Sequence, residues 1–230
     1  MRIAVVFVNG GVGFAAWPAN HEVSILKSQY DRVVPAGFLI MNITDTLMSA
    51  EEINLLADMV GKTFESYSCD EFVFSPAVYQ IVGLHVGGRA FVLLNEMQEN
   101  DYFGEGDDVP VINAKEAAPD EIRSHVVGGM LVDTPIDQVI EDIIVIEDTE
   151  YMSKDGEDPY RYNFTAAIVF VLFDRQVVFE RDCWFSEDFL IYRRPDALQK
   201  IKTANENASG SNTLDVRMER GVLHLGQRCG

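Results

Sequence analysis

Carboxylates are the reactive side chains that this sequence gathers most densely, and they could bind a metal, act as acid and base, or face a basic partner. Six acids lie within residues 96–108, and another six lie within residues 147–158. Like charges at this density repel one another unless solvent, a cation or a basic group neutralises them. The four acids that we select as partner-binding candidates are Asp101, Glu105, Asp107 and Asp108.

Calcium is the natural metal to consider, because clustered carboxylates are its preferred ligands. The acids of residues 101–108 do not fit an EF-hand, since the invariant glycine and the terminal glutamate are missing at the required offsets. The histidines also stand far apart, and none belongs to an HExxH motif. They are His21, His85, His125 and His224. We therefore assign no metal ligands and no cofactor.

No motif for a nucleophile or a dinucleotide is complete in this sequence. Residues 10–13, Gly-Gly-Val-Gly, follow an apolar segment, but the dinucleotide-binding pattern is incomplete. Pro18 also discourages a helix directly after these glycines. The GxSxG signature of serine hydrolases is absent. We therefore assign no catalytic and no cofactor-binding residue.

A second candidate binding segment combines large aromatic side chains with acids at residues 184–188. Such a segment at a break between strands can form a partner-binding edge, because tryptophan and tyrosine are favoured at interface centres. The alternative is core packing of the aromatic rings at a β-bulge. The candidates from this segment are Trp184, Phe185, Glu187 and Asp188.

The formal charge is strongly negative, with 37 acids against 18 lysines and arginines and a net charge of -19. The middle third of the chain, residues 95–160, holds 19 of the acids and 3 of the bases, and its net charge is -16. Phosphates and anionic lipids repel such a chain, so direct nucleic-acid and membrane binding are not expected. A basic protein surface is the expected partner.

Three cysteines stand at wide spacings, without a CxxC pair, at Cys69, Cys183 and Cys229. This arrangement argues against a disulfide scaffold and a four-cysteine zinc site, and it suits a reducing compartment. Cys183 has apolar neighbours, which predicts a thiol in the core. We also find no signal peptide and no apolar run of about 18 residues, so a cytoplasmic location is expected.

The clearest local prediction is a helix over residues 50–66. Ser49 stands at its N-cap and Glu52 follows three residues later, the spacing of a capping box. Apolar residues, Leu56 among them, then recur at helical spacing on one face. The sequence therefore predicts that Leu56 is buried.

Strand patterns dominate the rest of the chain. Residues 81–86 and 90–94 flank Gly87-Gly88, a signal for a tight hairpin. Other expected strands include residues 3–8, 33–43, 143–146, 164–173, 176–180, 189–192, 214–218 and 222–225. The two acidic segments, residues 96–108 and 147–159, carry turn residues and are predicted to be loops.

These patterns predict an α+β fold, a mainly antiparallel sheet built from β-hairpins with one well-capped amphipathic helix and acidic loops. We expect one domain over residues 1–230, with residues 204–212 as a flexible linker. The alternative is an N-terminal strand and helix unit over residues 1–70 and a β-rich unit over residues 71–230.

The best functional hypothesis is a non-enzymatic interaction protein of the inhibitor, immunity or regulatory type. Its acidic middle third would bind a basic partner surface, and its carboxylates could mimic the phosphates of nucleic acid. One alternative is an enzyme with dispersed, carboxylate-based or metal-assisted catalytic residues. Another is a structural subunit of a homo-oligomeric assembly joined through sheet edges.

Overall fold

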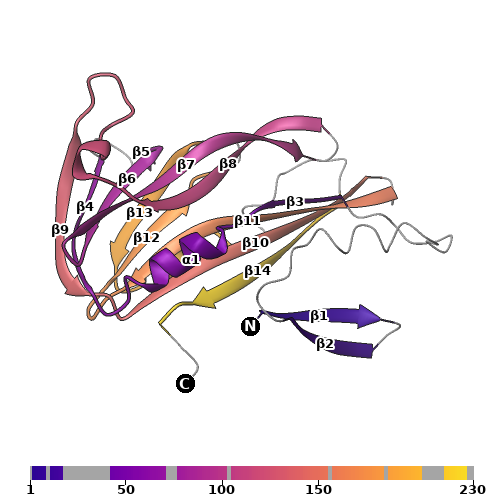
Figure 1. Ribbon diagram of the computed structural model, residues 1–230. Coiled ribbons are helices and arrows are strands. Elements are labelled where there is room, and N and C mark those ends of the chain that lie inside the picture. Colours follow the sequence, from indigo (N-terminus) through magenta and orange to yellow (C-terminus); the bar gives the residue numbers. More distant parts are fainter. Residues whose placement is uncertain are drawn as a thin grey trace. The chain divides into compact units, whose positions relative to one another are not determined.

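The computed structural model describes residues 2–8, 11–17, 42–70, 77–102, 105–154, 157–183, 186–203 and 215–226 (Figure 1). The chain forms two compact units, Met1–Leu39 and Ile40–Gly230. In the first unit, strands β1 (Arg2–Val8) and β2 (Gly11–Trp17) pair as an antiparallel hairpin, from Arg2 opposite Trp17 to Val8 opposite Gly11. The predicted linker at residues 204–212 lies outside the described residues.

The second unit contains two sheets. The larger has seven strands. Six of them follow one another in the order β14 (Asp215–His224), β10 (Asp142–Lys154), β11 (Glu157–Val171), β12 (Gln176–Arg181), β13 (Asp188–Arg194) and β5 (Ala77–Tyr79). The seventh, β3 (Asn42–Thr46), pairs in parallel with the first half of β11. The smaller has the order β8 (Glu105–Glu116), β7 (Arg89–Tyr102), β6 (Ile81–Val86), β4 (Thr63–Asp70) and β9 (Leu131–Val139). All pairings except that of β3 are antiparallel.

Aromatic rings from the two sheets meet in the main core. Phe64 of β4 lies 5.0 Å from Phe170 of β11, and Tyr67 of β4 lies 5.6 Å from Phe179 of β12, measured between ring centroids. All four rings are buried, which fits the large apolar area that aromatic side chains contribute to a core. Strand β4, which ends at Asp70, pairs with both β6 and β9, so the smaller sheet contains strands from both sides of residue 70.

The helix begins where the sequence predicts and ends earlier. Helix α1 covers Ala50–Ala57, with Ser49 and Glu52 forming both bonds of the capping box, and Leu56 is fully buried. The predicted end at residue 66 is wrong, because Gly61 adopts a positive φ of 81° and β4 begins at Thr63. Pairing of β4 with a strand on each side outweighs the helical spacing of its apolar residues.

The coarse prediction of an α+β chain dominated by antiparallel sheet is confirmed, but the predicted acidic loops are wrong. Residues 96–102 and 105–108 extend β7 and β8, and residues 147–154 and 157–159 extend β10 and β11. Cross-strand hydrogen bonding continues through these polar residues, so pairing overrides their preference for turns. Residues 215–224 likewise form one strand instead of the expected two.

Gly87 and Gly88 form the turn between β6 and β7, both with positive φ, as a two-residue primed turn requires. Cys69 is buried as part of β4, whereas Cys183 is exposed. The prediction of Cys183 as a core thiol is wrong, because β12 ends at Arg181 and Cys183 follows in a bend. Cys229 lies outside the described residues. Among the helices that are described, none has the length and apolarity to cross a membrane.

Candidate partner-binding pocket

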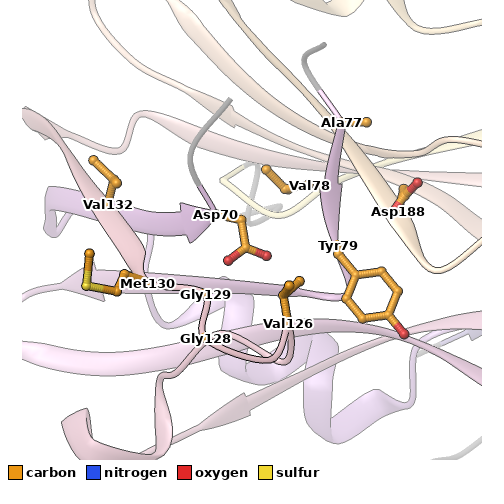
Figure 2. A pocket seen from close by; sticks show the side chains of 10 residues that line it. All are labelled: Asp70, Ala77, Val78, Tyr79, Val126, Gly128, Gly129, Met130, Val132 and Asp188. Atoms are coloured by element: carbon orange, nitrogen blue, oxygen red, sulfur yellow. The ribbon is translucent and has the colours of Figure 1, made fainter. Parts of the chain in front are cut away.

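A pocket of about 510 Å³ lies where the end of β4, the beginning of β9, strand β5 and the beginning of β13 come together (Figure 2). Residues 124–130 form a loop before β9, and the later part of this loop closes one side of the pocket. The loop turns at Gly128, whose φ of 75° favours glycine. The volume falls within the range of known ligand pockets.

Apolar side chains that are open to solvent surround this pocket. Tyr79 is 39% exposed, Val126 46%, Met130 81% and Val132 47%, and all four line the pocket. Val127, in the same loop, is fully exposed. Contiguous exposed apolar residues with polar neighbours mark binding surfaces on soluble proteins more often than isolated ones do.

Two carboxylates lie among these apolar groups. In the view of Figure 2, the carboxylate of Asp70 lies between the side chains of Val78 and Val126. Its Oδ2 atom is buried and has no hydrogen-bond partner among the described residues. Burial raises the pKa of Asp188, the second acid, and neighbouring acids add to this effect. Within the described part of the chain, neither carboxylate forms an ion pair with a basic side chain.

Glu187 holds the wall of the pocket in place. The Tyr79 hydroxyl donates a hydrogen bond of 2.6 Å to Glu187 Oε2, and the Gln80 side-chain amide donates one of 2.8 Å to Oε1. The backbone N–H of Met97 on β7 also donates to Oε1, at 3.3 Å. Gln80 Oε1 in turn contacts Nδ1 of His125, so the loop of residues 124–130 is joined to the same network.

Asn95 anchors the segment that carries Glu187. This side chain is fully buried on β7, and its amide nitrogen donates to the carbonyl oxygens of Ser186 and Asp188, both at 3.2 Å. Residues 186–188 are therefore fixed against the middle of the β7–β8 hairpin, where Asn95 pairs with Ile112, and this fixes the position of the Asp188 backbone at the pocket.

The structure distributes the predicted binding residues over two regions. Glu187 and Asp188 lie at the pocket, whereas Asp107 and Asp108 are exposed on β8. The backbones of Asp101 and Glu105 belong to β7 and β8, and Trp184 and Phe185 lie outside the described residues. On this hairpin, Asp108 stands directly opposite Glu99, a like-charge pairing that costs free energy when both are ionised.

Sequence reasoning missed Asp70, Tyr79 and the apolar loop of residues 124–130. These residues come from three segments, and none carries a motif. The one local signal was the run Val-Val-Gly-Gly-Met at residues 126–130, which places apolar side chains in a glycine turn instead of a strand. Apolar residues in such a turn have no sheet face on which to be buried.

A serine, a histidine and an aspartate also meet across β4, β6 and β9, but not in the order of a catalytic triad. Ser68 Oγ donates a hydrogen bond of 2.5 Å to Asp133 Oδ1, and His85 Nε2 lies 3.3 Å from the same hydroxyl. Ser68 donates directly to Asp133, so His85 does not stand between the hydroxyl and the carboxylate as the base of a triad does. The contact is therefore a polar ladder across the smaller sheet.

Potential metal ligands do not gather in threes within the residues that the structure describes. Comparison with known proteins finds no matching protein-family model, no matching curated protein and no matching solved structure. The second unit is thus a two-sheet α+β structure with an apolar-rimmed, acid-lined pocket beside the edge strands β5 and β9.

Proposed function

We propose that this protein is a non-enzymatic binding module that captures a basic partner protein at the pocket beside β5 and β9. One observation carries the proposal. Exposed apolar side chains gather around a pocket whose acids, Asp70 and Asp188, have no basic partner among the described residues. The apolar rim supplies contact area, and the carboxylates supply charge complementarity to a basic surface.

The excess negative charge has a second role in this proposal. Exposed acids such as Asp107 and Asp108 lie on the β7–β8 hairpin, which is joined to the pocket by the hydrogen bond from Met97 to Glu187. An acidic surface next to a binding site attracts a basic partner over about a Debye length, roughly 10 Å at 0.1 M salt. The acids of β8 therefore speed association, while the apolar rim slows dissociation.

Site-specific photo-cross-linking tests the proposal. The photoreactive residue p-benzoylphenylalanine replaces Val127 in one variant and Phe173 in a matched control. Phe173 is also strongly exposed but lies in the turn between β11 and β12, outside the pocket lining. We expect a discrete adduct with a basic protein from the Val127 variant in low-salt lysate, and much less in 1 M salt.

Other outcomes of this experiment separate the remaining hypotheses. Adducts from both variants in equal yield, or from neither, contradict a binding site at the pocket. An adduct between two copies of the chain at Val127 supports the structural-subunit hypothesis instead. Mass spectrometry of the cross-linked peptides distinguishes a foreign protein from a second copy.

A further inference from the structure

Strand β14 forms one edge of the larger sheet, and within the described residues it has a neighbouring strand, β10, on one side only (Figure 1). The backbone N–H of Leu225 donates to the Ile143 carbonyl, and pairing with β10 continues without a register shift back to Asp215. Backbone hydrogen bonds alternate between the two sides of an antiparallel strand, so the even-numbered residues of β14 direct their N–H and C=O groups to the outer side. A further strand can pair with the groups on that side.

The other edges of the two sheets in the second unit carry features that discourage such pairing. Strand β8 contains Pro110 and the exposed acids Asp107 and Asp108, and β9 contains Pro135. Strands β5 and β3 are only three and five residues long. Proline, clustered like charges and short length are common protections of sheet edges. Strand β14 is ten residues long, contains no proline and balances two acids against two arginines.

Arg217 and Glu219 give this edge side chains that complement a second copy of the same edge. Their side chains are 65% and 53% exposed and pair with each other. Tyr151 on β10 holds both in position, because its hydroxyl donates to Glu219 Oε2 at 3.0 Å and the Arg217 guanidinium lies 4.2 Å from the centre of its ring. A guanidinium has five N–H donors, so Arg217 can bind a second carboxylate while it keeps the first.

Only one symmetric pairing of two β14 strands places these opposite charges face to face. When the two-fold axis passes through Met218, Arg217 stands opposite Glu219 of the second copy, and Glu219 stands opposite its Arg217. Both are non-hydrogen-bonded positions, where facing side chains come closest, while Met218 exchanges backbone hydrogen bonds with its own copy. An axis through Arg217, Glu219 or Arg220 instead places two identical charges opposite each other, which is unfavourable.

We propose that two copies of this chain form an antiparallel dimer through β14, with Met218 at the two-fold axis and Arg217 and Glu219 paired across the interface. The two larger sheets then join into one continuous sheet. This assembly goes beyond the proposed function, because β14 contributes no residue to the pocket lining. Each dimer carries two copies of the pocket.

Sedimentation velocity of the full-length chain over a series of concentrations tests the proposal. We expect a wild-type dimer, and we expect Arg217→Glu and Glu219→Arg each to raise the Kd of dimerisation at least about tenfold. Each substitution replaces two opposite-charge pairs with two like-charge pairs across the interface. Arg89→Glu is the matched control, because it reverses an exposed arginine in a cross-strand pair with Glu116, away from β14. It makes the same change in net charge as Arg217→Glu and should leave the dimer unchanged.

Mixing the two charge-reversal variants distinguishes an interface from a role within one chain. At positions 217 and 219, the Arg217→Glu chain presents only acids and the Glu219→Arg chain presents only arginines. The mixture should therefore form a heterodimer with a Kd close to that of the wild-type dimer, although each variant alone is monomeric at the same concentration. Mixing does not repair damage within a single chain. Native mass spectrometry with one variant ¹⁵N-labelled identifies the heterodimer.

A wild type that stays monomeric over the whole concentration series overturns the proposal. A dimer that survives both charge reversals overturns it as well, and so does a mixture without heterodimer. If circular dichroism shows that a variant does not fold, amide hydrogen exchange of the wild type decides. The Met218 N–H should then exchange more slowly at high concentration than at low concentration, and equal rates overturn the dimer. The cross-linking at Val127 tests the pocket separately.

Discussion

Arg220 makes two hydrogen bonds of 2.7 Å with the carboxylate of Asp148, a side chain that has no exposed surface. The two residues stand opposite each other on β14 and β10, so the pair joins the last strand to the larger sheet. Arg181 lies close enough to act on the same buried region, with its guanidinium 4.0 Å from the centre of the Phe164 ring. Ionic groups thus form part of the interior on this face of the sheet.

Removing the arginine should destabilise the fold strongly. Arg220→Met leaves Asp148 buried without its bidentate partner, and such a loss costs about 3 kcal/mol of unfolding free energy. The double variant that adds Asp148→Asn should recover part of this loss, because no uncompensated charge remains. Urea unfolding of the wild type, both single variants and the double variant measures the coupling. Strictly additive effects would argue that the pair contributes nothing.

Glu180 predicts a pH dependence of stability. The side chain is fully buried, and burial raises its pKa to about 6, against an ordinary value of 4.5. Between these two values the folded chain binds the proton more tightly than the unfolded chain. Stability from this site therefore rises as pH falls from about 6 to 4.5, and ionisation above pH 6 costs about 2 kcal/mol.

Glu180→Gln isolates this effect from the many other acids. Relative to the variant, the wild type should gain about 2 kcal/mol of stability when the pH is lowered from 7 to 4.5. Glu51→Gln, at an exposed position of α1, is the control for the removal of a carboxylate. Chemical unfolding at a series of pH values supplies the curves, and a pH-independent difference for Glu180→Gln would contradict the assigned pKa.

The two described cysteines should differ sharply in reactivity. Burial raises the pKa of Cys69 to about 11, with a contribution from Asp70, and the thiol is covered by the core. Cys183 is exposed, so iodoacetamide should modify it in the native protein while Cys69 reacts only in denaturant. Peptide mapping in a Cys229→Ser background checks this. Native labelling of Cys69 at the rate of Cys183 would show that β4 is more open than the structure indicates.

The stability of the first turn of α1 should depend more on Glu52 than on the N-cap residue Ser49. Ser49→Ala removes one side-chain acceptor and should cost about 1 kcal/mol. Glu52 accepts from the backbone N–H of Ser49 at 2.7 Å and from that of Ala114 on β8 at 2.9 Å. Glu52→Ala should therefore cost about 2 kcal/mol, and Glu51→Ala, at an exposed position nearby, should cost much less. Thermal unfolding measures the loss of stability in the three variants. A smaller loss for Glu52→Ala than for Ser49→Ala would contradict a stabilising hydrogen bond from Ala114 of β8 to Glu52.

Features that depend on a few neighbouring residues could be predicted from the sequence. The capping box of Ser49 and Glu52 spans one helical turn, and the Gly87-Gly88 turn needs only glycines that tolerate positive φ. Leu56 was recognised as buried because helical spacing places it on the apolar face. Each of these signals acts within about four residues, where the physical preference is written directly into the sequence.

Polar strands and the pocket could not be predicted in this way. Asp148 can be buried within a strand because Arg220 pairs with it. Arg220 stands 72 positions later in the chain, so no local pattern indicates this pair. Asp70, Tyr79, Val126 and Asp188 become neighbours only because β4, β5, β13 and the loop of residues 124–130 meet at one place. The sequence by itself determined the local elements and the excess of acids. The pairing of distant strands decided which acids are buried and which surround a pocket, because desolvation and ion pairing depend on neighbours that only the folded chain brings together.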